Sequence, residues 1–428
     1  MKKIFLWIVS LGALAVAIVV LWPAYYGNPS VETSVPVADS TAQIARGRYL
    51  AQVSDCMACH TARGGTPFAG GRAIKTAYGT FVTPNITPDI GTGLGSWSTD
   101  DFWRAMHLGR SRDGHPLYPV FPYTDYTHIT RADADAIYAY LRSIPPASAP
   151  NQPHALHFPY DQRWLMYAWQ RVYFTPGVYQ PNPQQSEAWN RGAYLVNGAG
   201  HCGACHTSRN AMGSALSKSA LAGGFLVAQD WYAPALDQTP SASRSAAASE
   251  LATLLRTGTS ARHSVYGPMS EVVFGSLQYL TNEDALAIAD YLHSLPQSEP
   301  PPAPADMAKV SGQYTGELMQ RGAQLYHNDC AACHQINGAG VRHIYPALGA
   351  NASVLAPSPV NAIRMVLNGG FAPATALNPR PFGMPPFSPS YSDSDVAAVV
   401  TYMRQSWGND ASAVAPQDVA RFRSAPVD

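Results

Sequence analysis

Three stretches of the chain share one pattern of hydrophobic and polar positions. Each begins with a serine or threonine, has an aspartate three positions later, and continues with apolar residues at helical spacing that include a tyrosine. The stretches begin at Thr130, Thr281 and Ser392, and their tyrosines are Tyr140, Tyr291 and Tyr402. A hydroxyl residue three positions before an acidic one is typical of a helix N-terminus. The pattern therefore predicts three amphipathic helices that repeat along the chain.

A second predicted helix precedes each of these, and a cysteine motif follows it. The preceding helices carry the pairs Arg46-Gly47, Arg191-Gly192 and Arg321-Gly322. A C-x-x-C-H motif follows each glycine at nearly the same spacing. The motif cysteines are Cys56, Cys59, Cys202, Cys205, Cys330 and Cys333, and the motif histidines are His60, His206 and His334.

C-x-x-C-H is the attachment signature of a c-type haem. The two thiols add to the vinyl groups of the haem, and the histidine becomes the fifth ligand of the iron. The three motifs use all 6 cysteines of the chain. A zinc site would need a second ligand pair at fixed spacing, and none follows. We therefore expect three covalently bound haem c groups and no disulfide.

From the three motifs and the repeated helices, we expect a mainly α fold of three tandem class I cytochrome c-like domains. A length of 428 residues suits two to four domains. Charged residues are only 13%, and the 36 prolines and 34 glycines indicate loop-rich domains in which a buried cofactor replaces regular structure. In class I cytochromes the first and last helices cross, with a glycine of one against an aromatic residue of the other.

The 28 basic and 28 acidic residues balance, so nothing indicates a nucleic-acid partner.

The N-terminus predicts a membrane anchor. Lys2 and Lys3 precede an apolar run at positions 4–22, which ends in aromatic residues. A run of this length can span a bilayer, and interfacial aromatics mark the ends of spanning helices. The alternative is a signal peptide cleaved after Ala38. Both place the haem domains in the bacterial periplasm, and the first gives a single anchor in the inner membrane.

These signals divide the chain into eight segments. A signal-anchor transmembrane helix (1–27) and a tether (28–41) come first. The three expected cytochrome c domains span 42–145, 186–296 and 317–408. A packed linker rich in proline and aromatic residues (146–185) and a proline-rich linker (297–316) separate them, and a polar tail (409–428) ends the chain.

Methionines in the loops before the closing helices are candidates for the sixth iron ligand. Met269 precedes Tyr291, and Met384 precedes Tyr402 at a similar spacing. Each sits in a loop beside glycine and proline. Thioether ligation closes the iron and suits electron transfer.

The first repeat breaks this pattern. Phe121 occupies the corresponding position before Tyr140, where a ligand is expected, and phenylalanine cannot bind iron. The nearby residues that could do so are Met106, His107, His115 and His128. The sequence leaves two outcomes open for the first haem, bis-histidine ligation or a five-coordinate iron under an apolar lid.

Longer stretches resemble the three-haem cytochrome c subunits of bacterial membrane-bound dehydrogenases that oxidise alcohols, gluconate, sorbitol or aldehydes. The matching residues are 83–89 (TPNITPD), Thr92-Gly93, Trp97, Asp101-Phe102, 189–192 (WNRG), 194–196 (YLV) and 201–207. The family pattern in the first repeat is L-Y-P-A-M-P-Y, so Phe121 stands where its methionine would be. A Y-P-x-F-P-Y version is similar to cytochrome subunits paired with molybdenum hydroxylases, which act on aldehydes or N-heterocycles.

This resemblance implies an electron-transfer subunit without catalytic residues of its own. Its partners would be a periplasmic catalytic subunit with molybdopterin, PQQ or flavin, a small iron–sulfur subunit and ubiquinone in the membrane. Substrate chemistry would belong to the partner's cofactor. The alternatives are a free-standing anchored cytochrome and a peroxidase-like enzyme that uses an open first haem.

Overall fold

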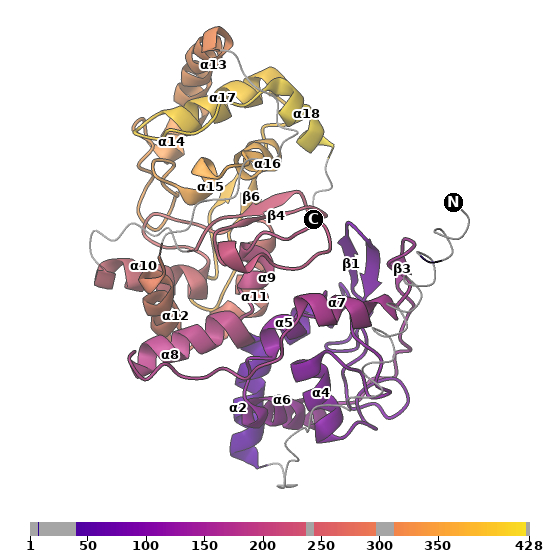
Figure 1. The fold of residues 1–428 in the computed structure, drawn as a ribbon. Coiled ribbons are helices and arrows are strands. Elements are labelled where there is room, and N and C mark those ends of the chain that lie inside the picture. The colour runs from indigo at the N-terminus through magenta and orange to yellow at the C-terminus, as the bar shows by residue number, and fades with distance from the viewer. Residues whose placement is uncertain (1–6, 8–39, 237–243, 297–311, 425–428) are drawn as a thin grey trace. The chain divides into compact units, whose positions relative to one another are not determined.

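The computed structural model describes residues 7, 40–236, 244–296 and 312–424, and it is mainly helical (Figure 1). The chain divides into two compact units. The first comprises Met1–Pro181 and Asn197–His201, and the second comprises Asn182–Val196 and Cys202–Asp428. Within the described residues, no helix is both long and apolar enough to cross a membrane. The predicted anchor and its tether lie outside those residues, apart from Trp7 and the last two positions.

The first unit combines short helices with one small antiparallel sheet. Its strands are β1 (Ala73–Thr76), β2 (Gly79–Val82) and β3 (Ala155–Leu156), in the order β1-β2-β3. Its helices are α2 (Thr41–Val53), α3 (Cys56–Cys59), α4 (Thr99–Leu108), α5 (Tyr123–Tyr126), α6 (Arg131–Ser143) and α7 (Leu165–Tyr173). The segment after residue 145 packs on this unit: β3 pairs with β2, Trp169 is buried, and Gln170 donates to the Gly109 carbonyl oxygen at 3.1 Å.

The second unit holds the third repeat and most of the second, whose residues Asn197–His201 belong to the first unit. The second repeat consists of α8 (Glu187–Tyr194), η1 (Leu195–Ala199), α9 (Gly203–His206), η2 (Ser217–Ser219), β4 (Gly224–Leu226), β5 (Trp231–Ala233), α10 (Arg244–Thr257), α11 (Pro268–Gly275), η3 (Leu277–Tyr279) and α12 (Asn282–Ser294). The third consists of α13 (Gly312–Leu325), η4 (Tyr326–Cys330), α14 (Ala331–His334), α15 (Ala352–Leu355), α16 (Val360–Asn368), β6 (Gly370–Phe371), β7 (Gly383–Met384), α17 (Asp393–Gln405) and α18 (Pro416–Arg423). Strands β4 and β5 pair antiparallel, as do β6 and β7.

Each repeat is built on a crossing of its first and last helices at a glycine. A Cβ atom on Gly47 would lie 1.7 Å from the Ala136 carbonyl oxygen. The same atom on Gly192 or Gly322 would lie 1.9 Å from the Ala287 oxygen or 2.2 Å from the Ala398 oxygen. In the second and third repeats it would also meet the Cβ of Tyr291 or Tyr402, at 2.9 and 2.7 Å. Only glycine fits these crossings, which confirms the predicted helix pairs α2/α6, α8/α12 and α13/α17.

An ion pair links the two helices at each crossing. It joins the arginine of the Arg-Gly pair to the aspartate at the start of the last helix, two motifs that lie apart in the sequence. Thr130, Thr281 and Ser392 cap the last helices, and each accepts a hydrogen bond from the backbone N–H of the aspartate three positions on. Each aspartate also binds the arginine beside the crossing glycine. The pairs are Arg46–Asp133 at 2.5 Å, Arg191–Asp284 at 2.7 Å and Arg321–Asp395 at 2.8 Å. In each Arg-Gly pair, the glycine therefore allows the two helices to approach closely, and the arginine forms an ion pair with the last helix.

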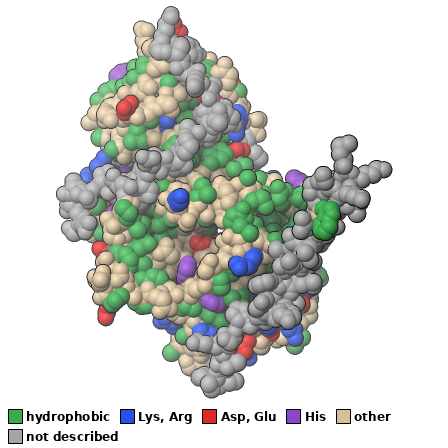
Figure 2. All heavy atoms as spheres, in the orientation of Figure 1, with side chains coloured by type: hydrophobic (Ala, Val, Ile, Leu, Met, Phe, Trp, Pro, Cys, Tyr) green, Lys and Arg blue, Asp and Glu red, His purple; other side chains and the backbone are tan. Residues whose placement is uncertain are grey.

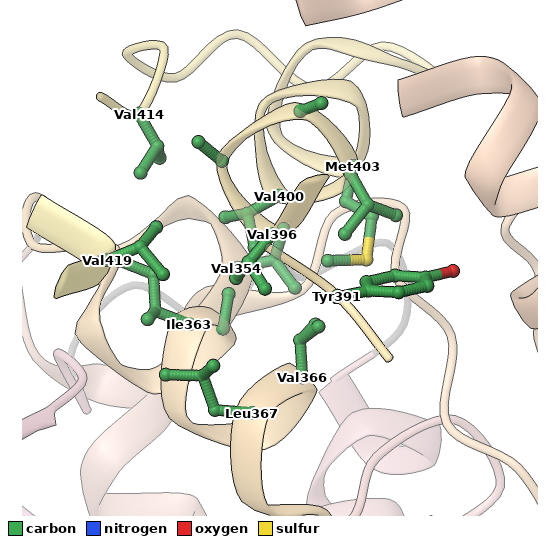
Figure 3. Close-up of a cluster of buried hydrophobic side chains, with 14 of the residues drawn as sticks. Val354, Ile363, Val366, Leu367, Tyr391, Val396, Val400, Met403, Val414 and Val419 are labelled. Atoms are coloured by element: carbon green, nitrogen blue, oxygen red, sulfur yellow. The ribbon is translucent and has the colours of Figure 1, made fainter. Parts of the chain in front are cut away.

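The C-terminal segment differs from the predicted polar tail. Val414, Val419 and Phe422 are buried in the core of the third repeat. Figure 3 shows Val414 and Val419 with core side chains of α15, α16 and α17. Arg423 extends from α18 to Asp393 at the start of α17, with 2.6 Å between Nε and Oδ1. Two buried apolar residues of α18, together with Val414 just before it, are enough to hold this helix, although most of its other residues are polar.

Charged side chains are few and scattered among uncharged ones on the face shown in Figure 2. This agrees with the charged fraction of 13%. No broad basic patch is visible on that face of the described residues.

Candidate haem centres

The histidines of the three C-x-x-C-H motifs share one hydrogen-bond arrangement. Nδ1 of His60 lies 2.8 Å from the Pro84 carbonyl oxygen, that of His206 lies 2.7 Å from the Pro234 oxygen, and that of His334 lies 2.9 Å from the Pro346 oxygen. A carbonyl can only accept, so Nδ1 carries the proton and the lone pair is on Nε2. Burial lowers the pKa of all three histidines, which favours the neutral imidazole. Each ring is thus held as a metal ligand requires.

Short helical turns position the cysteines of each motif. Helix α3 runs from Cys56 to Cys59, and α9 and α14 end at His206 and His334. Residues three apart in a helix lie on the same side, so both thiols of a motif face one space. All six cysteines are within the described residues, and none of them forms a disulfide there. This arrangement fits two thioether bonds to one haem.

The third motif opens onto a pocket that also contains its predicted methionine. Cys330, Cys333, His334 and Met384 all line this pocket. Met384 belongs to β7 and pairs with Gly370 of β6. The loop beyond it is fixed on α16, because the Phe387 backbone N–H donates to the Val366 oxygen at 3.0 Å. The two predicted axial residues of the third site are therefore brought to one cavity.

Strand β5 connects the two predicted axial residues of the second site. Met269 lies in the first turn of α11, shortly after Gly267. Gly267 has a φ of +57°, and a Cβ there would be 2.6 Å from the Trp231 ring, so glycine is required. Trp231 begins β5, and Pro234 just beyond this strand accepts the hydrogen bond from His206.

Phe121 lies one aromatic ring away from the first motif. Its ring centroid is 5.4 Å from that of Tyr126. The Tyr126 hydroxyl donates to the Ser54 carbonyl oxygen at 2.7 Å, and burial together with Cys56 and Cys59 raises the pKa of this tyrosine well above its usual value. Tyr126 therefore lies next to both Phe121 and the cysteines of the first motif.

The other candidates of the first repeat have contacts elsewhere. His107 stacks on Trp103, with centroids 4.4 Å apart, and its Nδ1 lies 2.9 Å from the Thr127 oxygen. Nδ1 of His128 lies 2.9 Å from the Gly177 oxygen, and exposed His115 pairs with Asp113 at 2.9 Å. Met106 is buried in α4. The contacts named for the three histidines are with residues outside the first motif.

Sequence reasoning included His201 in the family resemblance without giving it a role, and it missed the three prolines. His201 clusters with the first unit and packs edge-on against Tyr126, with ring centroids 5.4 Å apart. Because His201 directly precedes Cys202 in the sequence, sequence reasoning would assign it to the second site. The prolines that accept from the motif histidines follow them by 24, 28 and 12 residues, and this irregular spacing hides their common role.

Comparison with known proteins agrees with this geometry. The Cytochrome c family model matches residues 44–145 and 319–407, which contain the first and third motifs. The chain is 36% identical over 405 residues to the alcohol dehydrogenase (quinone) cytochrome c subunit of Gluconobacter oxydans, covering 90% of this chain and 84% of the relative. The chain belongs to this family of dehydrogenase cytochrome c subunits. As a member, it carries covalently bound haem c.

Two further relatives of this cytochrome subunit differ in length. It is 37% identical over 397 residues to the gluconate 2-dehydrogenase cytochrome c subunit of Pantoea cypripedii, covering 89% of this chain and 90% of the relative. It is 42% identical over 376 residues to a subunit of the nicotinate dehydrogenase of Pseudomonas putida. That match covers 87% of this chain, which spans only 31% of the length of the relative.

Proposed function

We propose that the chain carries three haem c groups and relays electrons from the catalytic subunit of a periplasmic dehydrogenase to ubiquinone or the respiratory chain. The observation that supports it most is the threefold recurrence of one site design. Each motif histidine is neutral and oriented by a proline carbonyl, next to two cysteines on one helical turn. The proposal divides the chain into three cytochrome c domains, 42–145, 186–296 and 317–408, with α18 added to the core of the third.

The residues of the chain have three roles in this relay. Cys56, Cys59, Cys202, Cys205, Cys330 and Cys333 attach the haems, and His60, His206 and His334 bind the irons. A bound haem supplies one-electron exchange between ferrous and ferric iron. Met269 and Met384 close the second and third irons, raise their potentials and exclude small ligands. The proline carbonyls keep each imidazole in one orientation and one tautomer.

The partner is proposed from the relatives and from Phe121. The relatives are named as subunits of alcohol, gluconate and nicotinate dehydrogenases. Nicotinate is an N-heterocycle, and the Tyr118-Pro119-Val120-Phe121-Pro122-Tyr123 version of the first loop favours a molybdopterin subunit that oxidises aldehydes or N-heterocycles. A PQQ or flavin subunit is the other class, and a small iron–sulfur subunit would connect a molybdopterin centre to the haems.

We place the protein on the periplasmic side of the bacterial inner membrane, held by the apolar run 4–22. This position brings the haems within reach of both a periplasmic dehydrogenase and membrane ubiquinone.

Purification of the tagged full chain from detergent-extracted membranes tests the proposal. We expect a dehydrogenase subunit to co-purify and its substrate to reduce the haems in the absence of any added mediator. A chain that purifies alone, and whose haems no aldehyde, alcohol or N-heterocycle reduces in the membrane extract, would be a free-standing carrier. Peroxide turnover by the isolated chain would instead indicate an enzyme.

A further inference from the structure

One segment of the second repeat, residues 258–269, packs against the third repeat within the second unit. The start of this segment packs closely against the third repeat. Gly258 has a φ of +76°, and a Cβ there would be 2.2 Å from Cγ of Pro373. The next residue, Thr259, accepts a hydrogen bond through its hydroxyl oxygen from Asn378 Nδ2 at 3.2 Å.

The middle of this segment braces the loop that holds the third motif histidine. The His343 backbone N–H donates to the Ala261 oxygen at 3.2 Å, and the Ala347 N–H donates to the Arg262 oxygen at 2.8 Å. Ala347 directly follows Pro346, whose carbonyl accepts the hydrogen bond from His334. The second repeat therefore shares in positioning the proximal ligand of the third site.

The end of the segment reaches both sites. Tyr266 lines the pocket of the third site together with Cys333, His334 and Met384. Gly370, which pairs with Met384, lies beside the Tyr266 ring, because a Cβ on Gly370 would be in ordinary van der Waals contact with Tyr266 Cδ1, at 4.0 Å. Just beyond Tyr266 the same segment supplies Met269, the proposed sixth ligand of the second haem. Gly267 and Pro268 between them fix the direction of the chain.

We propose that Tyr266 is the bridge through which the second and third haems exchange electrons, an inference that rests on the proposed three-haem relay. One electron leaves the ferrous iron of one haem and reduces the ferric iron of the other. No bond forms or breaks, and no proton moves. The Tyr266 ring lines the third pocket, and its residue lies three positions before Met269 in the first turn of α11. A void there would lose these contacts and weaken the electronic connection.

Substitution of the ring tests the bridge in the haem-loaded full chain. Tyr266→Leu and Tyr266→Ile remove the ring in two ways, so the result does not depend on one variant folding. Tyr266→Phe retains the ring without the hydroxyl. Tyr279→Leu is the matched control, because Tyr279 of the same repeat is 42% exposed. Flash photoreduction delivers less than one electron per chain. Absorbance changes then follow the movement of this electron between the haems. The spectra of Met269→Ala and Met384→Ala assign the absorbance changes to the second and third haems.

We expect the redistribution between the second and third haems to slow several-fold in both ring-free variants, and to stay at the wild-type rate in Tyr266→Phe and Tyr279→Leu. Wild-type rates in the ring-free variants, or equal slowing in Tyr266→Phe, would overturn the bridge. Slowing in Trp231→Leu alone would assign the path to the Trp231–Gly267 contact instead. Haem content of the wild type is measured first. Fewer than three haems would refute the relay itself, and the bridge with it.

Discussion

At the scale of single residues, the account depends most on the sixth ligands. Met384 shares a pocket with His334, and Met269 follows a glycine that packs on the strand leading to the His206 partner. Met269→Ala and Met384→Ala should each remove one share of the weak near-infrared sulfur-to-iron band and lower one midpoint potential. Redox titration with near-infrared absorption checks both. Met212→Ala, at a residue that is 50% exposed, should change neither. An unchanged spectrum in either axial variant would assign that iron to another ligand.

Phe121 leads to a second prediction at this scale. A phenyl ring has no lone pair, so the first haem should differ from the other two in ligation and in potential. We expect electron paramagnetic resonance of the wild type to show two His/Met haems and one haem of another type, with the lowest potential. Phe121→Met should convert it toward the His/Met type and raise its potential, because methionine ligation raises the potential of haem iron. Three His/Met haems in the wild type would show that comparison of the loops before the three closing helices selects the wrong residue. Met106 would then be the next candidate to test.

At the scale of elements, the glycine crossings should be the most sensitive points of the fold. Helix α13 offers a matched pair. A Cβ on Gly322 would lie 2.2 Å from a backbone oxygen of α17, whereas one on Gly316 would have nothing within 4 Å. Gly322→Ala should lower the free energy of unfolding by about 1–3 kcal/mol or more through overpacking. Gly316→Ala should be neutral or stabilise by up to about 1 kcal/mol, because alanine is the better helix former. Denaturant midpoints of the two variants measure this, and equal midpoints would contradict the crossing.

The same elements explain what the sequence could predict. The capped helices and the glycine crossings were predictable because their signals are local and repeat three times. The arginine–aspartate pairs were not, because their partners are 87, 93 and 74 residues apart, although both halves were recognised as motifs. The proline acceptors were missed for a similar reason, since loops of different length bring them to the histidines. Helix α18 was missed because burial of Val419 and Phe422, with Val414 just before the helix, outweighs a polar composition, and only the tertiary core reveals this burial.

At the scale of the whole molecule, the first expectation concerns the N-terminal run, which lies outside the described residues apart from Trp7. Intact-mass measurement should find residues 4–22 in the mature protein, because this apolar run is longer than a typical secretory signal core. Deletion of residues 1–27 behind a cleavable signal should release the cytochrome from the membrane fraction. A mature N-terminus near Asp39 would show that the segment is a cleaved signal instead.

The haem content of the full chain tests the three-haem relay most directly. Covalent haem stays on the chain after denaturation, so pyridine haemochrome spectra on purified protein give a ratio per chain. We predict three haems in the wild type and two in each variant in which one motif loses both cysteines, such as Cys202→Ala with Cys205→Ala. A ratio of two or fewer in fully matured wild-type protein would contradict the account.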